Sequence, residues 1–266
     1  MYPPRIFAIV LRVLYLIRES PARILPLVIW VAMDIILWGF LSRYLNSVTS
    51  GFNLIPALLG AVLLWDFFGR VMQGVTTAFF EDVWSRNFLN MFATPLSISE
   101  YVSGLVLASV ATSSVGLVVM LILATVVFGL SFFLYGALVI PFVLVLFLSG
   151  IAMGIFGISI VLRYGPAAEW LVWPIPALLS PFVGVFYPLA TLPRWMQVIA
   201  RVLPPSYVFE ELRGIVHHHG ASFIGLLIAF LLAIGYVLLA AWTFTRIFQH
   251  AVRTGLIARY SAESVN

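Results

Sequence analysis

Long apolar runs that carry few charged residues constrain the fold of this chain more than any other feature of its sequence. The runs over residues 101–128 and 133–162 contain no Asp, Glu, Lys, Arg or His. A helix needs ~20 apolar residues to cross the hydrocarbon core of a bilayer, and both runs are longer than that. Charged residues make up 9% of the chain, whereas a soluble protein contains roughly 25%. Because so few charges cannot cover a surface in water, the sequence predicts an all-α integral membrane protein.

The apolar runs predict six transmembrane helices within a single transmembrane domain over residues 1–266. The fifth is the shortest and contains Pro174, Pro176 and Pro181. The predicted spans are residues 24–41, 55–80, 101–128, 133–162, 170–186 and 223–248.

The first 19 residues form a separate element. Arg5, Arg12 and Glu19 follow one another at seven-residue steps, on one side of a possible helix. The apolar run over residues 6–17 is too short to span a bilayer, so we expect an interfacial helix over residues 1–19. A signal peptide is the alternative, but no small-residue cleavage site follows.

The basic residues predict the orientation. The chain contains no Lys, so its net charge of +4 depends on Arg alone. With six spans, nine arginines gather on the side that holds both termini, and four lie on the other side. The positive-inside rule then places both termini in the cytoplasm, together with residues 81–97. This charge reports membrane orientation and does not imply nucleic-acid binding. The nine are Arg5, Arg12, Arg18, Arg23, Arg86, Arg163, Arg246, Arg253 and Arg259.

Residues 81–97 are the longest polar interruption in the first half of the chain. Their pattern predicts an amphipathic helix that ends near Ala93, because Pro95 cannot continue it. Asp82 and Arg86 are spaced to form an ion pair on its polar face, and Ser97 with Glu100 has the form of a capping box. The helix either docks a partner protein or simply lies at the membrane interface. Its apolar face is Trp84, Phe88, Met91 and Phe92, and its polar residues are Glu81, Asp82, Arg86 and Asn90.

Residues 187–222 predict two short helices on the outer side. The first follows Pro193, and Pro204-Pro205 ends it. Ser206 is a candidate N-cap of the second helix. We expect the pair to form a lid, with the apolar face of the first helix packed on the protein. The candidate lid residues are Trp195, Ile199, Arg201, Glu210 and Arg213, and Val198 and Val202 complete the apolar face.

Three charged residues lie inside predicted spans, where charge is costly and usually faces protein or water. Asp66 and Arg70 are four residues apart on one helix and can pair. Asp34 lies at a similar depth in the first span, so Arg70 could bridge both acids. The cluster is either a structural clamp between spans one and two or a site for substrate or protons.

The order of these elements, with two local patterns, resembles the membrane subunit of type-2 ABC exporters. One pattern is residues 81–97, which resemble the coupling helix of that family. The other is residues 186–189 (FYPL) followed by Leu192-Pro193, residues 203–206 (LPPS) and residues 209–213 (FEELR), which resemble its C-terminal signature.

The resemblance implies an exporter of drug, lipid or glycan-type substrates in the cell inner (plasma) membrane. Two copies of this chain would form the path and work with two cytoplasmic ATPase subunits. Those partners would bind ATP and Mg, and this chain would hold no cofactor. Glu81, Asp82, Arg86 and Asn90 would couple the ATPase to the spans.

The sequence lacks the motifs of the competing classes. It has no G-x-x-x-x-G-K-[ST] phosphate loop and no cysteine, which excludes a cysteine nucleophile and a thiolate metal site. An intramembrane protease is the main alternative, yet neither G-x-S-G nor G-x-G-D is present. A passive channel or scaffold is another. His217, His218 and His219 are consecutive, so their side chains diverge on a helix, and we expect a solvated loop there instead of a metal site. We therefore expect no catalytic residues and no metal.

Overall fold

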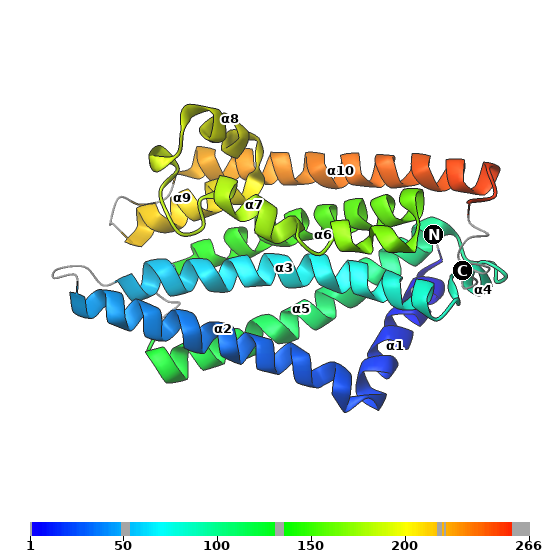
Figure 1. Ribbon diagram of the computed structural model, residues 1–266, viewed down its shortest axis with the longest axis horizontal. Helices are drawn as coiled ribbons and strands as arrows, with labels where there is room; N and C mark the ends of the chain where they lie inside the picture. The colour runs from blue at the N-terminus through cyan, green and yellow to red at the C-terminus, as the bar shows by residue number, and fades with distance from the viewer. Residues whose placement is uncertain (1, 49–53, 131–135, 217–219, 221, 257–266) are drawn as a thin grey trace.

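The computed structural model describes residues 2–48, 54–130, 136–216, 220 and 222–256, and no strand occurs among them. Helices account for most of these residues, in agreement with the all-α prediction (Figure 1). The elements are α1 (Pro3–Glu19), α2 (Pro21–Val48), α3 (Leu54–Trp84), α4 (Phe88–Met91), α5 (Ile98–Phe128), α6 (Val139–Tyr164), the 3₁₀ helix η2 (Pro166–Leu171), α7 (Ile175–Val183), the 3₁₀ helix η3 (Leu189–Thr191), α8 (Arg194–Val202), α9 (Pro204–Val216) and α10 (Phe223–Arg253).

Four helices in the described part of the chain are long and apolar enough to cross a membrane. They cover Leu58–Trp84, Ile98–Phe128, Gly136–Tyr164 and Phe223–Arg253. The predicted first span, residues 24–41, falls within α2, a helix of 28 residues. Several side chains near the start of α2 lie outside the described part of the chain.

The predicted fifth span is wrong as a continuous helix. Residues 170–186 contain the end of η2, a turn and then α7, which has nine residues and is ~14 Å long. Pro174 and Pro176, at the start of α7, account for the interruption, since proline removes a backbone donor and clashes with the preceding helical turn. The chain nevertheless passes from one end of the molecule to the other through η2 and α7 (Figure 1).

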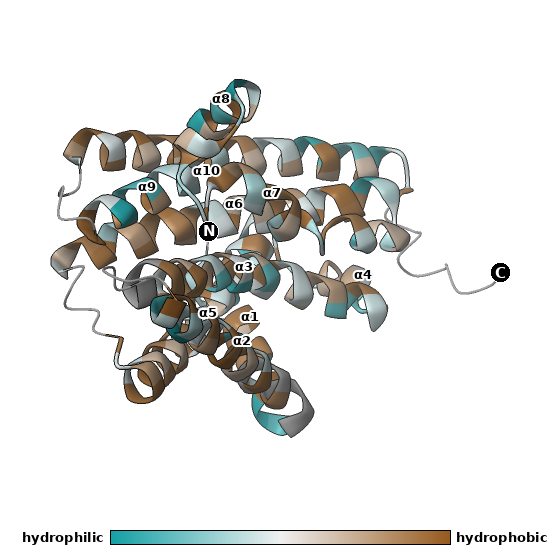
Figure 2. Ribbon diagram, turned by 60° about the vertical axis from the view of Figure 1, so that its left-hand side comes forward, coloured by the Kyte–Doolittle hydropathy of each residue, from teal (hydrophilic) through white to brown (hydrophobic). Residues whose placement is uncertain are grey.

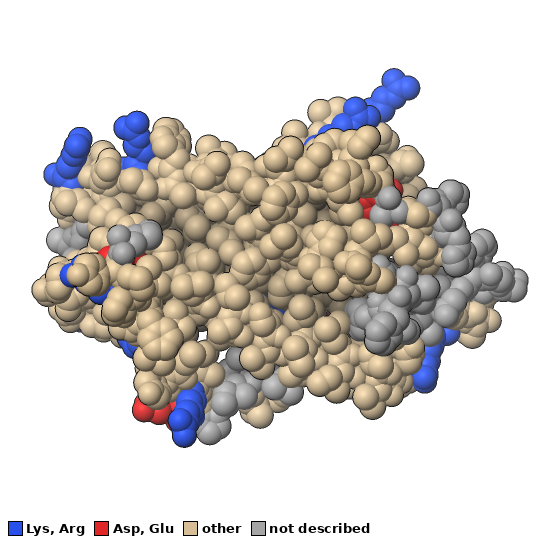
Figure 3. Space-filling view, turned by 180° about the vertical axis from the view of Figure 1, so that it is seen from behind, with Lys and Arg blue, Asp and Glu red and all other residues tan. Residues whose placement is uncertain are grey.

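The long helices lie side by side, so the molecule has two distinct ends (Figure 1). We call them the α4 end, where α3 finishes and α5 begins, and the α8 end, where α9 finishes and α10 begins. Charged side chains gather at both ends and leave an uncharged band between them (Figure 3). The long helices are hydrophobic over most of their length (Figure 2). This distribution is what a body that crosses a bilayer requires, because charge is costly in hydrocarbon.

The core is centred on α3, which packs against α2, α5 and α6. In an apolar stretch of 18 residues in α3, 61% of the residues are buried. The corresponding fractions are 17% in α5 and 22% in α10. Hence α3 is the interior helix, and α5 and α10 leave much of their surface uncovered by the rest of the described chain.

Two glycines of α6 let it approach α3 closely. Gly150 and Gly154 have the G-x-x-x-G spacing that favours close packing of membrane helices. A Cβ atom on Gly150 would lie 2.8 Å from Cβ of Val71 and 2.9 Å from the carbonyl oxygen of Phe68. That oxygen belongs to the α3 backbone, which cannot give way as a side chain can.

Gly150→Ala should therefore destabilise the protein by about 1–3 kcal/mol, as overpacking of a full core does. The matched control is Gly235→Ala in α10, because a Cβ atom there meets nothing within 4 Å. Thermal unfolding of the purified variants in one detergent measures the difference. Equal midpoints for the two variants would contradict the close approach of α6 to α3.

Candidate functional site

Asp82, near the end of α3, joins three helices through its buried carboxylate. Its Oδ1 forms an ion pair with Nη2 of Arg12 in α1. Its Oδ2 accepts a 2.6 Å hydrogen bond from the hydroxyl of Tyr101, a buried residue of α5. A buried carboxylate needs such partners, because an unpaired charge in a protein core costs several kcal/mol. We call Arg12, Asp82 and Tyr101 the Arg12 cluster.

The start of α1 has a second attachment, at the first turn of α5. Glu100 accepts hydrogen bonds from the backbone N–H of Tyr2 at 2.7 Å and of Ser97 at 3.0 Å. Nη1 of Arg5 lies 3.6 Å from Oε2 of Glu100. The hydroxyl of Ser97 in turn accepts from the N–H of Glu100, which confirms the predicted capping box. Helix α1 is thus fixed to α5 at its start and to α3 in its middle.

The single helix predicted over residues 81–93 is wrong. Helix α3 ends at Trp84, and only Phe88–Met91 form the short helix α4. Between them Arg86 adopts a left-handed conformation with φ of 56°, which is uncommon for a residue other than glycine and turns the chain. The predicted pairing of Asp82 with Arg86 is replaced by the pairing of Asp82 with Arg12.

The turn gives this segment a buried side and an exposed side. Phe88 is buried, and its ring packs edge-on against those of Phe79 and Phe92, with centroid separations of 5.2 Å. Phe92 also contacts Phe248 of α10. The exposed side consists of Trp84, Ser85, Arg86, Asn90, Ala93 and Thr94. Residues 84–94, which we call the α4 segment, therefore form an exposed surface at the end of the molecule (Figure 1).

The structure separates the four residues that the sequence grouped together here. Asp82 is a buried anchor, while Arg86 and Asn90 lie on the exposed side of the α4 segment. Glu81 is half-buried on the last turns of α3.

Sequence reasoning missed two partners of this region. Arg12 interrupts an apolar run, which is a signal of a buried charge, but its partner is 70 residues away in the chain. Nε1 of Trp84 donates a 2.8 Å hydrogen bond to Oε2 of Glu169 in η2, and no sequence pattern connects these two residues. The α4 segment is thus tied to α1, α5 and η2.

The charged cluster inside the spans is partly as predicted. Nε of Arg70 lies 2.7 Å from Oδ2 of Asp66, one turn away on α3, which confirms that pairing. Asp34 of α2 interacts electrostatically with both residues. The side-chain stem of Arg70 runs close to Gly116 of α5. The cluster therefore lies where α2, α3 and α5 meet.

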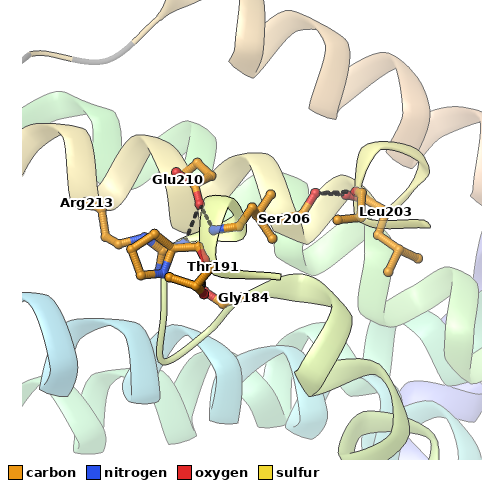
Figure 4. A network of polar contacts seen from close by, with 9 residues as sticks. Gly184, Thr191, Leu203, Ser206, Glu210 and Arg213 are labelled. Carbon is orange, nitrogen blue, oxygen red and sulfur yellow. Dashed lines mark hydrogen bonds and ion pairs between the residues drawn. The ribbon is translucent and has the colours of Figure 1, made fainter. Parts of the chain in front are cut away.

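A second polar network lies at the α8 end (Figure 4). Oε1 of Glu210 accepts a 2.6 Å hydrogen bond from the N–H of Leu189 and lies 2.9 Å from Nη2 of Arg213. Nη1 of Arg213 donates to the carbonyl oxygen of Gly184 at 2.7 Å. The loop after α7 is therefore held on α9 by two charged side chains. Of the predicted lid residues, Glu210 and Arg213 meet in this network.

The apolar face predicted for residues 194–202 is present in α8, but its predicted packing is wrong. Trp195, Val198, Ile199 and Val202 are 38% to 62% exposed. The side of α8 that packs against the protein is the one with Ala200, which is buried, followed by Leu203 just after the helix. Arg201 is exposed. Ser206, predicted as an N-cap, lies inside α9 and donates hydrogen bonds to the carbonyl oxygens of Ala200 and Leu203.

Metal ligation finds no support in the described part of the chain, where no group of three or more His, Cys, Asp or Glu side chains is placed to hold an ion. His217, His218 and His219 lie outside the described residues.

The Arg12 cluster yields a test of its own. Arg12→Leu leaves Asp82 charged and buried, so it should cost about 3–5 kcal/mol, whereas Arg12→Leu with Asp82→Leu should cost less. Arg18→Leu is the matched control, because Arg18 is exposed on the same helix. Thermal stability in detergent measures all three. A double variant less stable than Arg12→Leu alone would show that Asp82 does not depend on Arg12.

We compared the sequence of this chain with models of known protein families. Residues 6–217 match the ABC-2 type transporter family, which covers α1 to α9 and both polar networks. A comparison with curated proteins gives no match. The match covers most of the chain, and the long apolar helices agree with it. The chain therefore belongs to the ABC-2 type transporter family, as a multi-pass membrane permease component of an ABC transporter.

Proposed function

We propose that this chain is the membrane subunit of an ATP-driven exporter and that the α4 segment is its contact with a cytoplasmic ATPase subunit. The proposal rests on the position of the α4 segment, which is exposed and directly follows a buried anchor. Arg86 and Asn90 are exposed, while the adjacent Asp82 is locked into α1 and α5. A partner that pushes on the exposed side would move α1, α3 and α5 together, because the buried ion pair and the aromatic contacts hold these helices to one another. ATP and Mg would be bound by the partner.

The proposed topology has six crossings, with both termini in the cytoplasm of a cell whose inner (plasma) membrane holds the protein. The four long apolar helices supply four crossings, α2 the fifth, and η2 with α7 the sixth. The α4 end carries more arginines than the α8 end, and such an excess is typical of cytoplasmic surfaces. Those at the α4 end are Arg5, Arg12, Arg18, Arg86, Arg163, Arg246 and Arg253, and those at the α8 end are Arg43, Arg194, Arg201 and Arg213.

The proposed path for the substrate runs along a polar stripe on α3. Asp66, Arg70, Gln73 and Thr77 follow one another at steps of three or four residues, so they lie on one side of that helix. Gln73 is exposed, although it is ~16 Å along the helix from Trp84. An amide at that depth must face water or protein, since lipid cannot satisfy it.

A second copy of the chain would complete the path, with the stripes of two α3 helices on either side. Asp34 borders the stripe from α2 and makes it acidic on balance. The substrate, of drug, lipid or glycan type, would pass between the two copies. Glu210 and Arg213 would hold the lid at the α8 end by fixing the loop after α7 to α9.

The contact with the ATPase is testable by crosslinking, because the chain has no native cysteine. Single cysteines at Arg86 and Asn90 should crosslink to the co-expressed ATPase subunit. A cysteine at Arg194, exposed at the α8 end, is the control and should not. Modification of the Arg86 cysteine by an impermeant reagent added outside intact cells would rule out the proposed orientation.

The path is testable by the reactivity of Gln73→Cys towards a water-soluble thiol reagent in membranes. We expect modification that blocks transport, since a thiol reacts as the thiolate and ionises in water. Val118→Cys is the matched control, because Val118 is exposed on the lipid-facing helix α5 and should stay unmodified. Equal rates for the two cysteines, with and without ATP, would contradict a water-filled path along α3.

A further inference from the structure

Helix α10 has one face that the rest of the described chain leaves uncovered. The helix packs mainly against α6 and α9, and Ala229, Ala233 and Ala240 are among its buried residues. At about 100° per residue, Gly235 and Arg246 lie roughly a third of a turn away from these alanines. Both are exposed. The face that contains them therefore points away from the helices on which α10 packs.

The middle of this face is hollow. A groove of about 440 Å³ runs along α10, and its lining is apolar apart from one tyrosine. A Cβ atom on Gly235 would meet nothing within 4 Å, so the space over this glycine is open. The lining residues are Ile228, Leu231, Leu232, Gly235, Tyr236 and Leu239. A lipid tail suits such a groove, because lipid tails are as apolar as its leucines.

The same face ends in basic side chains. Trp242, Arg246 and Arg253 continue the line of Leu239 at steps of three, four and seven residues, so they lie on one side of the helix. Cζ of Arg246 lies 5.6 Å from the centroid of the Trp242 ring. The helix contains no acidic residue, and no ion pair within the described part of the chain involves either arginine. Both arginines are exposed, and Figure 2 shows hydrophilic residues on the last turns of α10.

The depth of these residues in a bilayer follows from the length of the helix. Helix α10 has 31 residues and is ~46 Å long, whereas the hydrocarbon core is ~30 Å thick. Counted from Phe223, the ~20 residues that a span requires end at Trp242. Tryptophan is common where hydrocarbon meets the headgroups, and Arg246 lies one turn beyond, at the level of the phosphates.

The distance from the arginines to the groove matches one lipid. A lipid tail covers half of the hydrocarbon core, ~15 Å, which corresponds to ~10 residues of helix. A tail that starts beside Trp242 would therefore pass Leu239 and end in the groove near Leu232. The groove and the basic side chains are thus placed to hold the two parts of the same molecule.

A second copy of the chain is the other candidate for covering this face. Homo-oligomers are most often two-fold dimers in which like surfaces meet. With the two-fold axis along the membrane normal, two facing α10 helices would bring their arginines together at one depth, whereas an anionic lipid supplies the opposite charge. Figures 1 and 2 also place α10 and α2 at opposite edges of the molecule, so a second copy on the α2 side leaves α10 free.

We propose that α10 binds an anionic phospholipid from the leaflet at the α4 end. Its phosphate would lie at Arg246 and Arg253, and one of its tails would fill the groove over Gly235. The site requires only that α10 crosses a membrane. It does not depend on the ATPase contact or on the path along α3.

Quenching by spin-labelled lipid tests the proposal on the full-length protein in vesicles of phosphatidylcholine and phosphatidylglycerol. A fluorophore is attached to Leu238→Cys, which is exposed beside the groove but does not line it. Phosphatidylglycerol with a nitroxide on its tail should quench this label more than phosphatidylcholine with the same nitroxide. The matched control is the label at Val115→Cys, exposed near the middle of α5, a helix of equal length without arginine. Both lipids should quench it equally.

The arginines are tested by the same measurement. With the label at Leu238→Cys, Arg246→Gln should reduce the preference for phosphatidylglycerol about fivefold, the effect expected for one arginine near an anionic surface. Arg194→Gln is the matched control, because Arg194 is exposed at the α8 end, and it should leave the preference unchanged.

The groove is tested by filling it. Gly235→Leu adds a side chain where no protein atom is displaced, so the fold should persist while the lipid tail loses its place. Native mass spectrometry after one detergent wash should find less phosphatidylglycerol bound to Gly235→Leu than to the unmodified protein. Val115→Leu, which adds bulk to an exposed position of α5, is the control and should retain the lipid.

Three results would overturn the proposal. Equal preference for phosphatidylglycerol at Leu238→Cys and Val115→Cys would show that α10 holds no specific lipid. Weak quenching of the Leu238→Cys label by both lipids would show that a second copy or another protein covers the face. Full retention of phosphatidylglycerol by Gly235→Leu would show that the tail does not lie in the groove.

Discussion

The cost of placing polar groups in hydrocarbon shapes every part of this protein. Backbone N–H and C=O groups have no water to bond within the bilayer, so the chain forms long helices that satisfy them internally. Charged side chains gather at the two ends of the molecule (Figure 3). The charges that remain inside are placed where partners exist, as Arg70 beside Asp66 and Asp34 shows.

Helix α3 is the element on which the other helices are assembled. Gly150 and Gly154 bring α6 close to its middle, where packing supplies the attraction that the hydrophobic effect does not provide between helices in lipid. At its end, Asp82 binds α1 and α5 through one carboxylate. The exposed α4 segment follows directly after this anchor. In the proposed exporter, a force applied there would reach three helices without passing through a flexible loop.

The segment between α6 and α8, which contains η2 and α7, is attached to the rest of the protein at both ends of the molecule. Glu169 in η2 meets Trp84 at the α4 end, and Gly184 after α7 meets Arg213 at the α8 end. Pro174 and Pro176 prevent a continuous helix, but the attachments keep the segment in place. The chain thus has a second connection between its two ends, beside the continuous helices.

The sequence by itself determined the all-helical membrane class, because apolar length and scarce charge admit few other folds. It also determined local features that depend on neighbouring residues, such as the Ser97–Glu100 capping box and the Asp66–Arg70 pair. These predictions succeeded because the interacting groups are three or four residues apart, within one helical turn.

Only the tertiary structure decided which groups from distant parts of the chain meet. Asp82 was predicted to pair with Arg86, one turn away, but it pairs with Arg12, because α1 lies across the end of α3. The apolar face of α8 was predicted correctly as a pattern, yet its burial was not, because periodicity identifies an apolar face and not its neighbour. The left-handed turn at Arg86 likewise had no signal, since glycine usually occupies that conformation. Partner choice depends on how helices pack in three dimensions, and no local pattern of residues contains that information.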